Sequence, residues 1–336
     1  MAFTSATQNA TEKESESVLA SICFHAVMQF PVILHKKELH LRVVASVLLV
    51  CLLLSTSSGC NSLPTRDLTE DGAIAKTVGF ITAADPEEAG PSHDRNWRPD
   101  LAVLPYAEVS SDRVHLYNIR DCEYRGEEDY DVRHYDRQIL LDDVVSIDFI
   151  VVPFKEAPAI AHTMLSFGLR DGEHIVFSVE ARLEQGENYS LIPSASGQYE
   201  LIWVVGTERD LIRLRTDVRD VDVYLYPIKA TPEQVRKVFV AGIERINEIA
   251  ERPEYYDLLK NNCTTNIVGM VNSLKPGYIP SDVRILLPGH SDRLAYELGL
   301  LAVDGPFEVV KQASKINLVA KLNSDSEDFS RAIRRY

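Results

Sequence analysis

The sequence predicts an α+β fold in which an antiparallel sheet packs on helices. Residues 144–153 form a continuous β-branched run that is typical of a buried strand. Residues 162–169 and 173–182 alternate in polarity on either side of a short turn, which is typical of a hairpin. Residues 235–249 carry an apolar stripe at helical spacing, and helix start signals lie just before it at 231–234. Strands joined by a hairpin and followed by helices indicate the α+β class.

Composition excludes several classes of function. The chain has 336 residues, of which 45% are hydrophobic and 25% charged, as in an ordinary globular protein. Its formal net charge of −15 argues against nucleic acid as a partner, because a phosphate backbone attracts clustered Lys and Arg. The sequence has no glycine-rich phosphate loop, no HExxH motif and no histidines at metal-ligand spacing. We therefore expect no cofactor and no metal.

The first 60 residues have the pattern of an export signal. Basic residues at 36, 37 and 42 precede an apolar run, 43–54, that is short for a membrane-spanning helix. Residues 1–27 are polar and irregular, so either Met1 or Met28 fits as the true start. Export of the rest of the chain is the prediction.

The end of this leader resembles a bacterial lipobox. Small residues and a Gly-Cys pair come after the apolar run, so that Cys60 would become the lipidated first residue of the mature chain. Ser57 stands where a lipobox usually has a larger apolar residue. A plain cleaved signal and an uncleaved anchor are the alternatives, and all three export the remainder of the chain.

We divide the chain into four parts. Residues 1–60 are the leader, and residues 61–95, rich in Thr, Ala, Glu, Pro and Gly, are a flexible tether. Residues 96–310 form the folded domain. Residues 311–336 are moderately polar and are expected to be a peripheral tail.

Two cysteines, Cys122 and Cys263, lie outside the leader. Two are no disulfide framework, although a bridge between them is possible on counting grounds and would remove a free thiol. Residues 261–266 (Asn-Asn-Cys-Thr-Thr-Asn) precede an apolar helical stretch, which places Cys263 at the start of a helix. That position favours the nucleophilic thiolate. A buried structural cysteine is the alternative.

The hairpin supplies a base for this thiol. Its apolar side chains fall on odd numbers in both strands, so both sets share one face only if residues 170–172 form a three-residue loop with Gly172 in the left-handed region. In that register His162 lies opposite Glu180. A carboxylate that orients an imidazole is what a general base requires. The alternatives are a surface ion pair, or a Glu180 that pairs with Arg182 or another cation.

Further elements are predicted around these two. Strands are expected at 113–119, 200–205 and 221–228, with a loop or edge hairpin at 121–137. Thr207 caps a short helix, 208–215, whose Arg209, Arg213 and Arg215 either bind an anionic group or form a solvated face. Thr231 and Gln234 form a capping box, and Ser291 is expected to cap a helix that runs to residue 300.

Five blocks in order, 146–153, 161–163, 178–182, 208–216 and 261–266, resemble the Lnb N-terminal periplasmic domain family. That domain is the exported part of a bacterial lipoprotein N-acyltransferase, and the resemblance covers about residues 96–301. It implies a circularly permuted papain-like layout of the NlpC/P60 kind, with Cys263 as nucleophile, His162 as base and Glu180 as the third polar residue. The membrane segments of the full acyltransferase are not seen after the domain.

The function expected from these residues is that of an exported cysteine-dependent acyltransferase or hydrolase, acting through an acyl-enzyme on lipid or lipoprotein acyl groups. A membrane-anchored or lipid-linked substrate is the expected partner; protein partners are not indicated. A cell-wall peptide amidase and a catalytically silent envelope binding module are the alternatives. Candidate oxyanion or substrate-binding residues are Asn262, Thr264, Tyr255, Tyr256, Arg213 and Arg215, and His290 is a weaker rival base.

Overall fold

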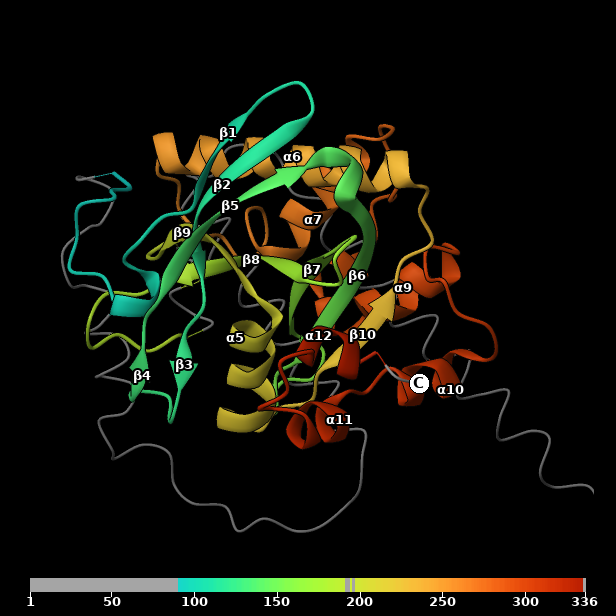
Figure 1. The fold of residues 1–336 in the computed structure, drawn as a ribbon. Coiled ribbons are helices and arrows are strands. Elements are labelled where there is room, and N and C mark those ends of the chain that lie inside the picture. The colour runs from blue at the N-terminus through green and yellow to red at the C-terminus, as the bar shows by residue number, and fades with distance from the viewer. Residues whose placement is uncertain (1–89, 191–193, 195–196, 335–336) are drawn as a thin grey trace, which may run out of the picture. The chain divides into compact units, whose positions relative to one another are not determined.

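The computed structural model describes residues 90–190, 194 and 197–334 (Figure 1). The expectations for the leader, for Cys60 and for most of the tether fall outside these residues. Among the described helices, none combines the length and the apolar character that crossing a membrane would need.

One large sheet organises the described chain. Its strand order is β1-β2-β9-β8-β7-β6-β10, and β5 pairs with β2 at one end. The strands are β1 (Tyr106–Val109), β2 (Arg113–Arg120), β5 (His134–Leu140), β6 (Val144–Pro153), β7 (Ala161–Leu169), β8 (His174–Arg182), β9 (Glu200–Thr207) and β10 (Tyr224–Pro227). A separate small hairpin joins β3 (Glu123–Tyr124) and β4 (Tyr130–Asp131), within the segment predicted as a loop or edge hairpin.

The prediction of an antiparallel sheet needs one correction. The pairings on both sides of β6, β7 and β8 are antiparallel, but β2 and β9 run parallel, through Arg120 and Gly206. No tight turn joins these two strands, because β9 comes after β8 in the chain, so nothing in their connection imposes the antiparallel direction. The sheet is therefore mixed, and the α+β class is confirmed.

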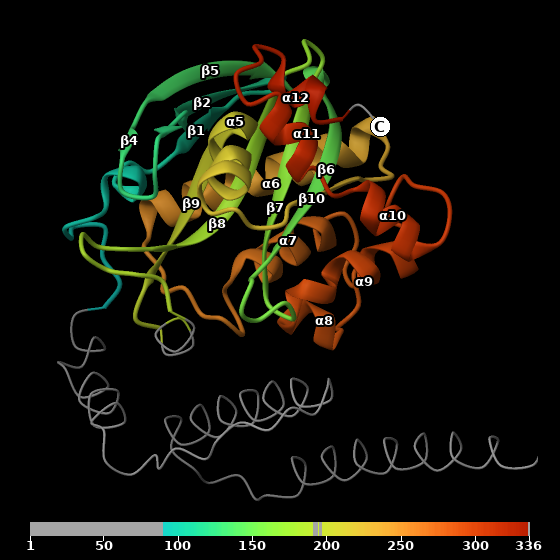
Figure 2. The same cartoon turned by 90° about the horizontal axis from the view of Figure 1, so that it is seen from below.

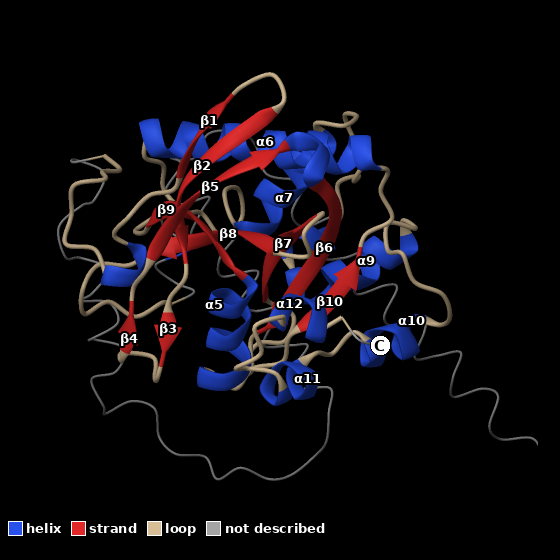
Figure 3. Cartoon of the chain, viewed as in Figure 1, coloured by secondary structure: helices blue, strands red, loops and turns tan. Residues whose placement is uncertain are grey.

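The helices are distributed along the whole described chain. They are η2 (Pro99–Leu101), η3 (Leu141–Asp143), α5 (Glu208–Arg213), the π-helical turn η4 (Leu214–Val218), α6 (Pro232–Glu251), α7 (Cys263–Asn272), α8 (Val283–Leu286), η5 (Pro288–His290), α9 (Ser291–Glu297), α10 (Phe307–Ala313), α11 (Asn317–Leu322) and α12 (Phe329–Ala332). Figure 3 distinguishes them from the strands by colour.

Helices cover both faces of the sheet. Odd-numbered side chains of β7 and β8 meet α6, where the rings of Phe167 and Phe177 lie 5.2 and 5.3 Å from that of Phe239. Even-numbered side chains meet the opposite layer, where Ser166 donates to Glu208 of α5. Because successive side chains of a strand point to opposite faces, α6 and α5 lie on opposite sides of the sheet. Figures 1 and 2 show α7 near α6, and α11 and α12 beside α5.

Local capping largely agrees with the predictions. Thr231 and Gln234 form the capping box of α6, and Thr207 caps α5 by accepting from the Asp210 N–H. The expected cap at Ser291 is wrong: the Ser291 hydroxyl donates to the Pro288 carbonyl, and α9 ends at Glu297. The η5 turn ahead of α9 supplies that carbonyl, so the serine closes the preceding turn.

The C-terminal segment packs closely on the domain. We expected a peripheral tail from residue 311, yet Ile316, Ala320, Phe329 and Ile333 are buried in the core cluster. The side chain of Arg334 also reaches Asp148 of β6 and Glu208 at the start of α5. Apolar side chains spaced three or four apart explain this packing, because they give α11 and α12 one face to bury.

Candidate active site

The hairpin of β7 and β8 has the predicted register. Met164 pairs with Ser178, so the same register places His162 opposite Glu180 two residues further along. The loop has three residues, and Gly172 takes a φ of 95°, in the region that favours glycine. The Leu169 N–H donates to the Glu173 carbonyl over 2.8 Å, which closes the loop. The odd and even faces are therefore separated as the sequence predicts.

His162 and Glu180 meet on the even-numbered face. His162 Nε2 lies 3.2 Å from Glu180 Oε1 and 2.7 Å from the Ser178 hydroxyl. The same hydroxyl donates to Glu180 Oε1 over 2.7 Å. Arg215, from η4, donates to that carboxylate oxygen over 2.9 Å. The carboxylate thus holds the imidazole on one side and is itself held by a buried guanidinium.

Cys263 is the first residue of α7, as predicted. Asn262 caps the helix, with Oδ1 accepting from the backbone N–H groups of Thr264 and Thr265 at 2.9 Å each. The thiol lies at the start of β7, 3.9 Å from the Ala161 carbonyl, and forms a side-chain hydrogen bond with His162. Because Nε2 of His162 faces Ser178 and Glu180, we assign Nδ1 to the thiol. Both Cys263 and Cys122 are free, which excludes a bridge between them.

The electrostatics favour a thiolate–imidazolium pair. Burial opposes charge on His162, but the negative charge of Glu180 and the hydrogen bond to Cys263 raise the pKa of His162 to about 9. Burial likewise opposes ionisation of Cys263, but the hydrogen bond and positive charge of His162 lower the pKa of the thiol to about 7. The two shifts leave a wide pH range in which both groups are charged.

The other cysteine has the opposite environment. Burial, together with the nearby negative charge of Asp210, raises the pKa of Cys122 to about 12. The Cys122 N–H donates to the Asp210 carboxylate, which also forms a buried, two-pronged salt bridge with Arg120 at 2.8 Å. Cys122 is therefore a structural thiol.

A cavity of about 470 Å³ gives access to the pair. It is lined by His162, Glu180 and Cys263 from three different elements, and by Tyr189 and Tyr256. Its other walls carry charged and apolar groups, including Arg98, Arg120, Arg219, Val152, Phe154 and Leu286. A volume of this size admits a small molecule or the end of a larger one.

Two of the expected oxyanion donors already have acceptors within the protein. The Thr264 N–H already donates to Asn262, and the Asn262 amide nitrogen donates to the Leu258 carbonyl over 2.6 Å. Among the described residues the Cys263 N–H has no hydrogen-bond acceptor. Tyr256 lies close enough to Cys263 and Tyr189 for their charges to add to burial in raising the pKa of its phenol. Of the expected donors, the Cys263 N–H is thus the one without an acceptor among the described residues, while the Tyr256 hydroxyl is hydrogen-bonded to Tyr189.

Three candidate residues lie apart from this cavity. Tyr255 forms a backbone bridge with Glu200, and Arg213 pairs with Asp217 at 3.3 Å, so neither lines the cavity around the thiol. His290 is exposed in η5 and is likewise absent from the lining. Arg215, by contrast, lines the cavity and binds Glu180 rather than standing free for an anionic substrate.

Two residues of the site were not assigned a role from the sequence. Ser178 lies two residues before Glu180 on the same face of β8, so the alternation of strand side chains could have predicted its contact with Glu180. Tyr189 comes from the segment between β8 and β9, where neither periodicity nor a motif indicates its position.

A second polar cluster lies on the same face of the sheet. Asp148, His174 and Glu208 lie close enough together to hold a metal ion. The guanidinium of Arg334 donates to Asp148 over 2.6 Å and to Glu208 over 2.7 Å. A protein cation therefore already balances the two carboxylates.

The comparisons with known proteins give one match. Residues 130–289 match the model of a family described as the Lnb N-terminal periplasmic domain. The matched segment contains His162, Glu180 and Cys263, and it is shorter than the span of resemblance expected from the sequence. No curated protein and no solved structure matches the chain.

Proposed function

Since residues 130–289 belong to the Lnb N-terminal periplasmic domain family, we propose that this chain is an envelope thiol enzyme that transfers or hydrolyses acyl groups. The family itself is a periplasmic one, which supports a location on the periplasmic side of the cell envelope. The observation that carries the proposal is the Cys263–His162–Glu180 arrangement, in which a helix-start thiol with a pKa of about 7 faces an imidazole held by a carboxylate.

The proposed reaction starts from the Cys263 thiolate and the protonated His162. The Cys263 thiolate attacks an ester or amide carbonyl carbon, and the carbon–oxygen double bond becomes an oxyanion as the S–C bond forms. When the carbonyl re-forms, the bond to the leaving alcohol or amine breaks, and His162 gives that group its proton. An amine or water then attacks the thioester and returns a proton to His162, so that the amide or acid is released and the thiolate is restored.

The remaining groups have supporting roles. Glu180 keeps the imidazole oriented and raises its pKa, so that it is protonated when the leaving group departs. The Cys263 N–H, at the positive end of α7, stabilises the oxyanion, and the Tyr256 hydroxyl is a second donor once its hydrogen bond to Tyr189 is broken. A His strand that precedes a Cys helix is also the order of a circularly permuted papain-like enzyme, and we propose that layout for this domain.

The preferred substrate is an acyl group of a lipid or lipoprotein, presented by a membrane-anchored molecule. The matched family is named for Lnb. The resemblance read from the sequence implies a lipoprotein N-acyltransferase, which favours this class of substrate. Lipidation at Cys60 would hold the domain near such a substrate, and we keep it as part of the proposal.

A peptide amide is the second candidate substrate. The cavity around Cys263 also exposes Arg98, Arg219 and Asn188, which are groups that can bind a peptide's carboxylates and carbonyls. A cell-wall amidase of the NlpC/P60 kind would use the same thiol chemistry. A silent binding module is the third reading, and it predicts that Cys263 is unreactive.

The test is to trap the acyl-enzyme. The wild-type chain and the Cys263→Ala and Cys122→Ala variants are incubated with cell envelopes, quenched in acid and examined by intact mass and peptide mapping. We expect an adduct on Cys263 in the wild type and in Cys122→Ala, whose mass identifies a fatty acyl or a peptidyl group. The absence of any adduct, together with slow alkylation of Cys263, would end the enzyme proposal.

A further inference from the structure

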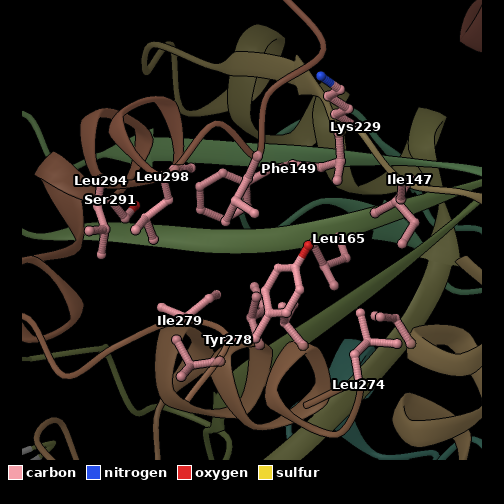
Figure 4. A pocket seen from close by; sticks show the side chains of 18 of the residues that line it. Ile147, Phe149, Leu165, Lys229, Leu274, Tyr278, Ile279, Ser291, Leu294 and Leu298 are labelled. Carbon is pink, nitrogen blue, oxygen red and sulfur yellow. The ribbon is translucent and has the colours of Figure 1, made fainter. Parts of the chain in front are cut away.

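A second pocket is lined in part by α7, and Figure 4 shows it from close by. It has a volume of about 90 Å³ and lies between β6, β7 and the helices α7, α8 and α9. Its walls are almost entirely hydrocarbon, and Figure 4 shows Phe149, Leu165, Leu274, Leu294 and Leu298 around it. We name it the α7–α9 pocket. An apolar cavity of this kind excludes water and is available to an apolar ligand.

The few polar groups in its wall already have partners or reach water. The Thr264 hydroxyl bonds the Thr163 hydroxyl at 3.0 Å, and the Ser291 hydroxyl donates to the Pro288 carbonyl. Gln234 accepts from the Thr231 N–H. Lys229 and Tyr278 are exposed at the rim. A peptide buried here would leave its N–H and C=O groups without partners, so the lining selects a hydrocarbon chain.

The α7–α9 pocket and the catalytic cavity are lined by neighbouring residues of the same two helices. Thr264 lines the pocket, and its neighbour Cys263 lines the cavity. In α8 the same division occurs, because Ile285 lines the pocket and Leu286 lines the cavity. The two cavities therefore lie on either side of the chain at the start of α7 and at the end of α8.

Exposed apolar side chains continue the pocket outward. Val283 and Leu286 of α8 are 65% and 41% exposed, and Tyr278 and Leu298 are each 37% exposed. The cavity is smaller than the one of about 150 Å³ that holds benzene in an engineered protein, so it has room for only a few carbon atoms as it stands. The rest of a longer chain would lie over these exposed residues.

We propose that the α7–α9 pocket holds part of the hydrocarbon chain of an acyl substrate whose carbonyl carbon lies at Cys263. This inference rests on the proposed function, because it uses the thiol as the other end of the same ligand. The chain crosses from the cavity over Leu286 and Ile285, and its far carbons occupy the space between Leu165, Val268 and Leu298. Burial of methylenes there favours long acyl groups over acetyl groups.

The test measures binding of a fatty acid rather than catalysis. The full chain is titrated with cis-parinaric acid, whose fluorescence rises in an apolar site, as wild type and as Val268→Trp, which fills the pocket. Val309→Trp makes the same change at an exposed valine of α10 and is the matched control. Leu298→Asp, at the exposed rim, is the second variant and introduces a charge without burying a large ring.

We expect saturable binding to the wild type and to Val309→Trp. In Val268→Trp and Leu298→Asp the affinity should be lower by at least about tenfold, which corresponds to the loss of about two buried methylenes. No saturable binding to the wild type, or equal affinity in all four proteins, would overturn the inference. The rate at which iodoacetamide modifies Cys263, measured in the same samples, tests the proposed thiol chemistry independently of fatty acid binding. A reactive thiol without fatty acid binding rejects the pocket alone.

Discussion

Arg215 donates to Glu180 Oε1 over 2.9 Å, and that oxygen is the one that faces His162 at 3.2 Å. The carboxylate is therefore shared between a permanent cation and a titratable one. Its own pKa lies well below the usual range, because the charges of His162 and Arg215 outweigh the effect of burial. The positive charge of Arg215 opposes protonation of His162. The same guanidinium holds the Glu180 carboxylate, whose negative charge favours protonation of His162.

The first prediction separates these two effects. Glu180→Gln should lower the pKa of His162 by about 1 to 3 units, because the opposite charge beside the imidazole is lost. Arg215→Gln should raise it, because a like charge is removed. Titration of the His162 ring by NMR, assigned by comparison with His162→Gln, gives both values. Shifts in the same direction would contradict the assigned geometry.

The second prediction concerns the two thiols. At pH 7 a thiol with a pKa of about 7 is half ionised, whereas one with a pKa of about 12 is ionised in about one molecule in 10⁵. We expect iodoacetamide to modify Cys263 at least about a hundredfold faster than Cys122, even though a less basic thiolate is a weaker nucleophile.

The His162→Ala variant tests the cause of that difference. Without the imidazolium, burial opposes ionisation of Cys263 with only the hydrogen bonds of Thr163 to favour it, and the reaction of the thiol at pH 6 to 7 should slow by about tenfold or more. Peptide mapping of the alkylated chain gives the rates at both cysteines. Equal, slow modification of both in the folded protein would mean that Cys263 is structural.

Periodicity explains why the hairpin could be predicted. Strand side chains alternate strictly, so the odd-numbered apolar residues of both strands permit one register, and that register brings His162 to Glu180. The helix start at Cys263 was similarly predictable, because Asn262 is a strong cap residue. The catalytic roles of these residues stay predictions.

The neighbours of the site could not be predicted in the same way. Arg215 reaches Glu180 across 35 residues of chain, and Tyr189 comes from an irregular segment, so no local pattern connects them. The cap at Asn262 also has a consequence that the sequence did not reveal, since it occupies the Thr264 N–H expected at the oxyanion. The parallel pair of β2 and β9 likewise depends on a long connection.

The third prediction concerns the C-terminal arginine. Arg334 lies between Asp148 and Glu208, so Arg334→Met leaves two buried carboxylates without their cation. We expect a loss of about 3 to 5 kcal/mol in the free energy of unfolding. Urea denaturation at pH 7 measures it. Arg331→Met, at an exposed position of α12 just before Arg334, is the control and should change stability little.

The pH dependence of stability gives a further check of that cluster. Burial opposes charge on Glu208, but Arg334 lowers its folded pKa to about 2, below the ordinary value of 4.5. The stabilisation is therefore complete above about pH 4.5 and is lost as the pH falls towards 2. Burial raises the pKa of Asp148, which works in the opposite direction. The loss between pH 4.5 and 2 should be smaller in Arg334→Met than in the wild type.

The last prediction uses Gly289, in the η5 turn beside the start of β7. A Cβ at this position would overlap the Pro158 carbonyl oxygen and press on Ala159, both of them backbone groups. The Gly289 N–H also donates to the Ala159 carbonyl over 2.9 Å. Gly289→Ala must therefore displace the segment that leads into His162.

We expect Gly289→Ala to destabilise the protein by about 1 to 3 kcal/mol and to slow alkylation of Cys263, because the imidazole moves with its strand. Gly269→Ala is the matched control, since nothing lies within 4 Å of its added methyl group. Gly269 lies inside α7, where alanine should stabilise the helix by up to about 1 kcal/mol and leave the thiol as reactive as before. Unchanged alkylation in Gly289→Ala would show that η5 does not position His162.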